Sequence, residues 1–505
     1  MTKSTTCRIL FVAVLLTAMT SVLFGQEKPN VVLIYCDDLG YGDLSSYGAT
    51  EIATRHIDKL TQNGTKYTNA HSTSATCTPS RYALMTGIYP WRKQGTGVLA
   101  GDAKLIVPTD KVTLPKVFKQ AGYKTAIVGK WHLGLGGSVT KNWNQPIRPG
   151  PNEVGFDYSF IFPATADRVP TVFLENHSVI GLEAQDPIMV DYQKKIGQEP
   201  TGEENPELLK MQASPNHGHN NTIINGIGRI GFMTGGLQAR WVDEEITPTF
   251  LTVAKNFLEE SKEDPFFLFF SMTEPHVPRM PSTLFKGKSD LGYRGDAILQ
   301  LDWTVGQILD KLETLGIAEN TIIIFSSDNG PVLDDGYLDG AAKFKNVHKQ
   351  SGPLRGGKYS IFEAGTRVPL VISGPQIPKN KTSDILVSQI DILASVAQLL
   401  NLPSPADARD SHPLATSLFG AAEIGRPYLI EHAGCLAILK DDWKYIEPSH
   451  RPAYNKLTDI ELGNSTQPQL YNLQHDIGET KNIINEHPEI AKELQEILEN
   501  EKLKK

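Results

Sequence analysis

The stretch Val31-Val32-Leu33-Ile34-Tyr35 is an unbroken apolar run, and two acids, Asp37 and Asp38, follow it after a single cysteine. A short run without polar alternation is typical of a strand that is buried on both faces, as in a parallel sheet. Runs of the same kind occur at residues 125–128, 266–270, 321–325 and 369–372. These five runs predict a mostly parallel sheet.

Helical patterns lie between these runs, at residues 113–121, 247–260 and 293–315. Alternation of strands and helices indicates an α/β fold in which helices flank the sheet. The pattern changes from about residue 424, where runs at 428–430, 436–439 and 443–446 predict a small antiparallel sheet, followed by a charged helix at 488–502. We therefore expect a main α/β domain at 27–423 and a smaller C-terminal α+β subdomain at 424–505.

The first 25 residues have the pattern of a signal peptide. Lys3 and Arg8 give a positive start, an apolar run follows at 9–16, and small and apolar residues lead to Gly25. A retained membrane anchor is the alternative, but the run is short and interrupted by threonine and serine, which favours cleavage. We expect a periplasmic or secreted protein with no membrane attachment after cleavage.

Charge and cysteine content exclude two classes of protein. The formal net charge is -8, which argues against nucleic acid as a partner. Cys7 would leave with the signal peptide, and an odd number then remains: Cys36, Cys77 and Cys435. The chain is therefore not a disulfide scaffold. We assign no role to Cys36 or Cys435.

Polar side chains follow four of the predicted strands. In open α/β sheets, ligands bind beyond the carboxyl ends of the strands, so we expect these side chains to converge on one site. In chain order, they are Asp37 and Asp38, then Lys130 and His132, then His276, then Asp328 and Asn329.

The oxygen-bearing members of this set suit a hard cation. Asp37, Asp38, Asp328 and Asn329 offer carboxylate and amide oxygens, and adjacent carboxylates repel each other unless a cation lies between them. Calcium fits best and magnesium second. A turn or helix cap would be the ordinary explanation of one Asp-Asp pair, but two acidic clusters at strand ends favour a metal site.

The cationic candidates for binding an oxyanion are Arg81, Lys130, His132, His276 and Lys358. Cys77 begins a predicted helix whose first turn contains Pro79. A helix N-terminus has free N–H groups and partial positive charge, so it favours an anion. On these grounds Cys77 is either a reactive thiol or an inert buried one.

The segment Cys77-Thr78-Pro79-Ser80-Arg81 resembles the signature of the sulfatase family, in which this cysteine is converted to Cα-formylglycine. Further segments match in the family's order, at residues 37–43, 86–90, 129–134, 275–278, 327–330, 357–360 and 363–369. The resemblance implies an alkaline-phosphatase-like α/β fold, with the catalytic domain at 27–423. It also implies a maturation enzyme that generates the formylglycine.

The resemblance further implies roles for the site residues. Calcium is held by residue 77 together with the three aspartates and Asn329, and residue 77, as the aldehyde hydrate, attacks sulfur. Arg81 orients the hydrate, while the two lysines and two histidines hold the sulfate oxygens. His276, with Lys358, protonates the leaving alcohol. His132 then takes a proton from the second hydroxyl.

The substrate is indicated less directly. The segment from about 154 to 240 has weak periodicity and is rich in glycine, asparagine, proline and histidine, which predicts long loops over the active face. Polar side chains and an aromatic platform there can recognise sugar hydroxyls, although each is as readily a loop-packing residue. The candidates are Asp167, Arg168, His177, His217, His219, Asn220, Asn221 and Trp241. The segment resembles bacterial exo-acting glycan sulfatases, so we expect a sulfated galactose or N-acetylgalactosamine.

Two other functions fit the same residues. One is hydrolysis of phosphate or phosphonate monoesters, since related enzymes share the fold and even the formylglycine. The other is binding of sulfated glycans without catalysis, which the full set of site residues disfavours. A zinc phosphatase is disfavoured because the acidic clusters lack histidines at metal-ligand spacing.

Overall fold

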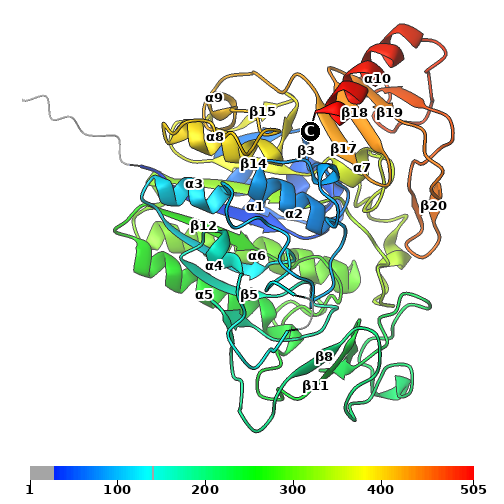
Figure 1. Ribbon diagram of the computed structural model, residues 1–505. Coiled ribbons are helices and arrows are strands. Elements are labelled where there is room, and N and C mark those ends of the chain that lie inside the picture. Colours follow the sequence, from blue (N-terminus) through cyan, green and yellow to red (C-terminus); the bar gives the residue numbers. More distant parts are fainter. Residues whose placement is uncertain (1–27, 139–140, 505) are drawn as a thin grey trace, which may run out of the picture.

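The computed structural model describes residues 28–138 and 141–504 (Figure 1). The expected signal peptide and Cys7 lie outside these residues. Within the described ranges, none of the helices combines the length and the apolar character that a membrane span requires.

A ten-stranded sheet forms the centre, in the order β15-β2-β14-β13-β1-β12-β4-β5-β6-β7. Its five middle strands run parallel: β13 (Thr321–Ser327), β1 (Asn30–Cys36), β12 (Phe266–Ser271), β4 (Lys124–Lys130) and β5 (Tyr158–Phe162). Alternate residues of β1 face two separate cores, with Leu33 in one and Ile34 in the other. Burial on both faces explains the unbroken apolar run. The predicted mostly parallel sheet is confirmed.

The expected direction of one strand is wrong. The run at 369–372 forms β14 (Leu370–Ser373), which pairs antiparallel with β13. Between them the chain makes only short helical turns, including α7 (Glu363–Thr366), and therefore returns from the same edge of the sheet. An apolar run reports burial on both faces but not direction. Outside β14 lie β2 (Gly64–Tyr67) and β15 (Lys381–Ser383).

The segment predicted to consist of loops, 154–240, also contributes to the sheet. It contains β5 and the edge strands β6 (Leu174–Glu175) and β7 (Ser178–Val179). Two-stranded ribbons within it are β8 (Met189–Asp191) with β11 (Phe232–Thr234), and β9 (Ile223–Ile224) with β10 (Ile227–Gly228). The remainder of this segment is mostly turns and irregular structure, as expected.

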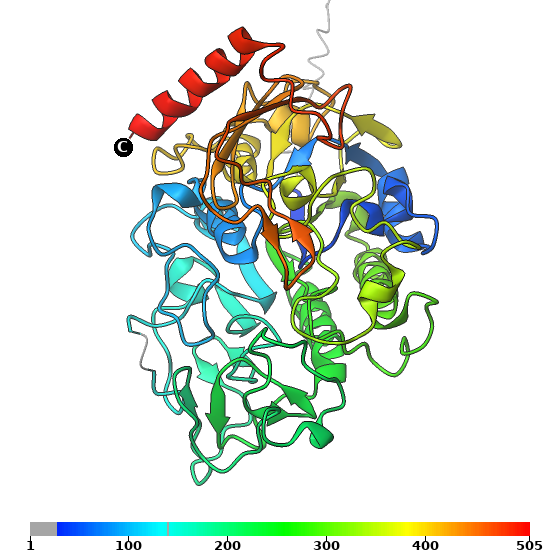
Figure 2. The ribbon, with the colours of Figure 1, turned by 90° about the vertical axis from the view of Figure 1, so that its right-hand side faces the viewer.

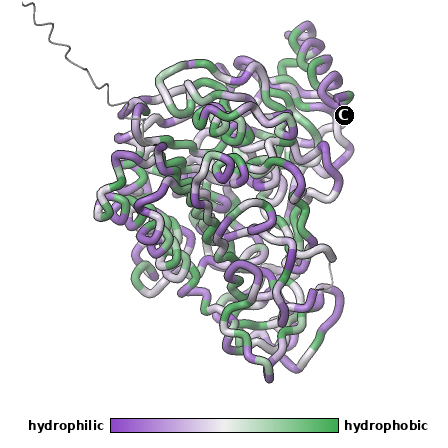
Figure 3. The backbone as a smooth tube through the Cα atoms, turned by 60° about the vertical axis from the view of Figure 1, so that its left-hand side comes forward, coloured by the Kyte–Doolittle hydropathy of each residue, from purple (hydrophilic) through white to green (hydrophobic). Residues whose placement is uncertain are grey.

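Helices cover both faces of the sheet (Figure 1). One core contains side chains of α2 (Cys77–Thr86), α3 (Leu114–Gln120), α8 (Ile392–Leu399) and α9 (Ala415–Leu418). The other contains side chains of α1 (Arg55–Gln62), α5 (Ile246–Ser261) and α6 (Gly292–Thr314). The predicted helices at 113–121, 247–260 and 293–315 are confirmed as α3, α5 and α6. In Figure 3 hydrophobic stretches gather in the middle of the molecule.

The C-terminal region forms the expected antiparallel sheet, in the order β17 (Leu429–His432), β18 (Leu436–Lys440), β19 (Trp443–Ile446) and β22 (Gln469–Asn472). Helix α10 (Pro488–Leu503) packs on it through Leu494 and Leu498 and lies at the edge of the molecule (Figure 2). The β20 (Tyr454–Asn455) and β21 (Ile460–Glu461) ribbon reaches down beside the α/β domain (Figure 1). The boundary itself, at residues 423 and 424, stays a prediction.

A buried ion cluster joins this sheet to the α/β domain. The Lys444 Nζ of β19 lies 2.8 Å from Glu363 Oε1 of α7, 3.3 Å from Glu431 Oε2 and 3.5 Å from Glu479 Oε1, and all four side chains are 0% exposed. Burial tends to raise the pKa of Glu363, but Lys444 outweighs it and lowers that pKa to about 2. Burial raises the pKa of Glu479 to about 8. One ammonium group therefore compensates several buried carboxyl groups.

Replacing Lys444 with methionine is expected to lower the free energy of unfolding by about 3–5 kcal/mol, because it removes the ammonium group shared by three buried carboxyl groups, of which Glu363 keeps an ion pair with Arg367. The loss should be larger near about pH 8 than near about pH 5, since without Lys444 the folded-state pKa values of these carboxyl groups rise, and a raised pKa contributes stability that is lost as the pH rises through it. Urea titration at both pH values measures this. The control is Lys440→Met, which removes a half-exposed ion pair worth about 0–1 kcal/mol. Equal losses in the two variants would contradict this account.

Candidate active site

The carboxyl ends of three parallel strands bring together charged side chains that are far apart in sequence. Lys130 is the last residue of β4, and Asp37 and Asp328 directly follow β1 and β13. Lys130 Nζ lies 2.6 Å from Asp37 Oδ2 and 3.6 Å from Asp328 Oδ2, and these three side chains are 0% exposed. The expected convergence of the strand-end residues is therefore present in the structure.

Oxygen atoms of the acidic residues face each other without enough donors. Asn329 Nδ2 donates to Asp38 Oδ1 at 2.7 Å, but Asp37 Oδ1 and Asn329 Oδ1 are buried and accept no hydrogen bond from any described residue. Leaving buried acceptors unsatisfied costs free energy. One ligand atom each of Asp37, Asp328 and Cys77 lie within 4.8 Å of one another. The carboxylate and amide oxygens of Asp37, Asp328 and Asn329 are hard ligands of the kind that a calcium ion takes.

Basic side chains surround these acids and shift their pKa values. Burial raises the pKa of Asp37 and of Asp328. Burial acts in the same direction on Asp38, but Lys358 and His276 outweigh it and hold the pKa of that carboxyl well below its usual range. The pKa values of the three acids therefore differ because their neighbours differ, and such perturbed pKa values are typical of functional sites.

Arg81 and Lys358 are fixed by these acids. Arg81, one turn into α2, donates from Nε to Asp328 Oδ2 at 2.9 Å and from Nη1 to Ser271 Oγ at 2.6 Å. Lys358 Nζ donates to Asp38 Oδ2 and to Asp335 Oδ2, both at 2.8 Å. Burial lowers the pKa of Lys358, but Asp335 and Asp38 raise it well above its usual value. Lys358 therefore remains a cation at neutral pH.

Cys77 is the first residue of α2 and is 1% exposed. It lines a pocket of about 250 Å³ together with His276 and Lys358. Burial raises the pKa of the Cys77 thiol. Because a nucleophilic cysteine needs a lowered pKa, the environment does not favour a reactive thiolate at this position.

Each of the two histidines uses one ring nitrogen in a hydrogen bond to a carbonyl, and the other nitrogen of His276, Nε2, lies 3.7 Å from Asp38 Oδ2. A carbonyl only accepts, so His132 Nε2 carries the ring proton and donates a hydrogen bond to the Leu99 carbonyl at 2.9 Å. The other nitrogen, Nδ1, is then an acceptor, and it is buried and has no partner in the described chain. The Val277 carbonyl likewise takes the Nδ1 proton of His276 at 2.6 Å. Burial and then Lys358 lower the pKa of His276 to about 4, and burial and then Lys130 lower that of His132. Both rings are neutral at neutral pH.

Four of the residues expected to contact sugar line the same pocket: Asp167, Arg168, His217 and His219. Asp167 organises the group, since its Oδ1 lies 2.9 Å from Arg168 Nη1 and its Oδ2 lies 3.0 Å from His219 Nε2. The carbonyl of Leu457 accepts from His217 Nε2 at 3.1 Å. The pocket thus combines an anion site with polar groups suited to hydroxyls.

The other four candidates do not line this pocket. Trp241 is 4% exposed and packs in the core, with ring centroids 5.4 Å from Phe162 and 5.7 Å from Phe173, so it offers no platform to a ligand. Trp241 precedes α5, and its indole packs in the same buried cluster as Ile246 and Phe250 of that helix. His177 Nε2 lies 3.1 Å from Glu153 Oε1 and does not line the pocket. Asn220 and Asn221 do not line it either.

The structure adds residues that were not predicted. Asp335 pairs with Lys358 and accepts from the Tyr359 hydroxyl at 3.0 Å. The Asp334-Asp335 pair between Asn329 and Lys358 was the available sequence signal. Asn455 and Thr458 also line the pocket, and they come from the C-terminal region, whose loops carry no pattern that points to a site.

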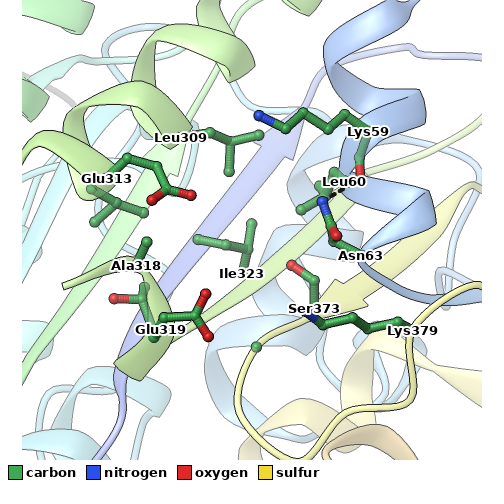
Figure 4. Close-up of a pocket in the computed structure, with 13 residues that line it drawn as sticks. Lys59, Leu60, Asn63, Leu309, Glu313, Ala318, Glu319, Ile323, Ser373 and Lys379 are labelled. Carbon is green, nitrogen blue, oxygen red and sulfur yellow. Dashed lines mark hydrogen bonds between the residues drawn. The ribbon is translucent and has the colours of Figure 1, made fainter. Parts of the chain in front are cut away.

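A second cavity, of about 150 Å³, lies away from this site (Figure 4). It is lined by the beginning of β13 and the end of β14, at the opposite edge of the sheet, and by Lys59, Glu313 and Glu319. It contains no residue of the predicted site, so we assign it no function.

An ester of a tetrahedral oxyanion is the substrate that this arrangement suits, which places the protein among hydrolases of such esters. The chain belongs to the sulfatase family, whose model matches residues 29–402, and it is a sulfuric ester hydrolase.

Similar proteins of known function and a similar solved structure agree with this family assignment. The chain is 52% identical over 480 residues to N-acetylgalactosamine-6-O-sulfatase of Bacteroides thetaiotaomicron, with 94% of each chain covered. It is 31% identical over 423 residues to human steryl-sulfatase, covering 77% of this chain and 70% of that one. A solved structure from work on the metabolism of multiple glycosaminoglycans by Bacteroides thetaiotaomicron superposes with a TM-score of 0.92 at 52% identity, covering 94% of this chain and 99% of the other. The fold is the alkaline-phosphatase-like one that the resemblance implied.

Proposed function

We propose that this sulfatase removes O-sulfate from a sulfated carbohydrate, N-acetylgalactosamine 6-sulfate or a similar galactose sulfate, with a formylglycine made from Cys77 and a bound calcium ion. One observation carries the proposal: the Cys77 anion site and the group formed by Asp167, Arg168 and His219 line one pocket. The similarity to an N-acetylgalactosamine-6-O-sulfatase supports the choice of sugar.

The residues present fit both cofactors. Asp37, Asp38, Asp328 and Asn329 would hold calcium, and the buried oxygens of Asp37 and Asn329 that lack a hydrogen-bond donor among the described residues are the observation that supports this. The cation would stabilise negative charge on the sulfate oxygens, and a hydrated formylglycine would supply a hydroxyl nucleophile and a second hydroxyl for release of sulfate. Membership of the sulfatase family supports a modified residue at position 77.

The other side chains bind the anion and move protons. Lys130 and Lys358 provide fixed positive charge next to residue 77, where it stabilises a developing anion without reorganisation. Arg81, held by Asp328, orients residue 77. Lys358, which stays a cation and lines the pocket beside His276, donates a proton to the leaving alcohol, while the unpartnered Nδ1 of His132 accepts a proton.

The same proposal includes the cell biology implied by the sequence. The signal peptide would direct the chain to the periplasm or outside the cell, and a formylglycine-generating enzyme would modify Cys77. Phosphate ester hydrolysis remains the alternative reaction.

A panel of substrates tests the function. We expect the enzyme to hydrolyse N-acetylgalactosamine 6-sulfate with a kcat/KM at least about 10²-fold above that for the corresponding 6-phosphate. The reason is that a sulfate ester carries a single negative charge, which we expect the site to stabilise better in the transition state than the higher charge of a phosphate ester. Ion chromatography of released sulfate and phosphate measures both reactions. Faster phosphate release, or hydrolysis of simple aryl sulfates only, would contradict the proposal.

A further inference from the structure

A further pocket, of about 330 Å³ and distinct from the cavity in Figure 4, adjoins the catalytic pocket. The two share Tyr359 and Asn455 as lining residues. Thr76 and Pro79, on either side of the first turn of α2, form its inner wall next to Cys77. Its outer wall comes from the C-terminal region. A molecule that occupies the catalytic pocket can therefore extend directly into this one.

Some polar atoms of the outer wall have no partner among the residues that the structure describes. The Arg451 guanidinium is exposed, and within residues 28–138 and 141–504 neither it nor the His432 ring forms a hydrogen bond or an ion pair. Asn464 is 7% exposed; its Nδ2 donates to the Pro452 carbonyl at 2.9 Å, but its Oδ1 is buried and unsatisfied in the described structure. A buried acceptor of this kind calls for a donor on a ligand.

The charge of Arg451 is also left uncompensated by nearby acids. The carboxylate close to His432 is that of Glu447, which is already bound to Lys502 Nζ at 2.5 Å and to the Leu436 N–H at 2.8 Å. Gly434 keeps the wall open, because a Cβ there would lie 3.2 Å from Arg451 Cδ and 3.4 Å from Asn464 Oδ1. The pocket thus offers one cation and one acceptor to the same ligand.

We propose that this pocket binds the sugar linked to the sulfated one, and that this sugar is a hexuronate. The inference rests on the proposed function. A hexuronate presents a carboxylate, which matches the planar fork of a guanidinium, and hydroxyl groups, which can donate to Asn464 Oδ1. The cavity has the size of a sugar-binding pocket, and Pro79, Ala433 and Leu462 provide apolar surface for the face of a sugar ring. Arg451 is therefore a specificity-determining residue for the neighbouring sugar.

The test compares Arg451→Gln with the wild-type enzyme on three substrates. These are N-acetylgalactosamine 6-sulfate, its disaccharide with glucuronate at the reducing end, and the same disaccharide with the carboxylate reduced to an alcohol. We expect kcat/KM of the variant to fall about 5- to 10-fold on the glucuronate disaccharide and less than about twofold on the other two. Arg451→Lys should lose less, because it keeps the charge without the fork.

Lys456→Gln is the matched control, since Lys456 is an exposed cation on the other side of β20 and does not line the pocket. An equal loss on all three substrates, or none on any, would overturn the subsite. So would a fall in kcat/KM on the reduced disaccharide as large as the fall on the glucuronate disaccharide. Wild-type enzyme inactive on all three would contradict the proposed function itself, and the subsite with it.

Discussion

Replacing Cys77 with alanine is expected to abolish sulfate ester hydrolysis, with a fall in kcat of at least about 10⁴-fold, and to leave the fold intact. Loss of a covalent nucleophile has effects of this size because the remaining groups only bind and polarise the substrate. Alanine is well tolerated in a helix, and only the buried sulfur is removed. Sulfate release and thermal unfolding of the same preparation measure the two parts of this prediction.

Cys36→Ala is the matched control, because Cys36 is also a buried free cysteine, in β1. We expect it to lose some stability from the cavity that it creates and to keep its activity. Turnover by the Cys77 variant at a rate near that of the wild type would refute the assignment of residue 77 as the nucleophile.

Asp328→Asn is expected to reduce kcat/KM by about 10²–10³-fold and to lower the bound calcium below one ion per chain. The substitution removes one of the charges that compensate the cation, and it also removes the carboxylate that holds Arg81 at 2.9 Å. Element analysis of the purified protein, together with calorimetric titration of calcium, separates loss of the ion from loss of Arg81 placement.

Asp302→Asn controls for the burial of the mutated acid. Asp302 is 5% exposed and accepts from the Ile57 N–H at 2.9 Å, away from the site. This variant should lose stability and retain calcium. Full calcium content and normal activity in the Asp328 variant would contradict the assignment of Asp328 as a calcium ligand.

The sequence could place the strand-end side chains together because the carboxyl ends of parallel strands meet at one edge of the sheet. Residues that directly follow β1, β4 and β13 could therefore be placed together without a structure. The direction of β14 could not be predicted, since its apolar residues report burial alone. Trp241 was misjudged for a related reason: an aromatic residue in an irregular segment is equally suited to a ligand and to the core.

The walls of the pocket were the least predictable part. Asp335 acts through Lys358 and Tyr359, and its proximity to them depends on how a loop folds back. Asn455, Thr458 and Arg451 come from the C-terminal region and reach the site only because the β20–β21 ribbon lies beside the α/β domain (Figure 1). Contacts between distant loops have no local sequence pattern. The sequence alone therefore predicts the type of reaction more readily than it predicts the substrate.

The chemical state of residue 77 decides whether the buried acids, the basic side chains and the neutral histidines act as described. The most direct measurement is the mass of the peptide that contains residue 77, taken from fully active enzyme purified from its native host. The account predicts that this peptide carries an aldehyde in place of the thiol. A fully active preparation whose peptide retains an unmodified cysteine would contradict it.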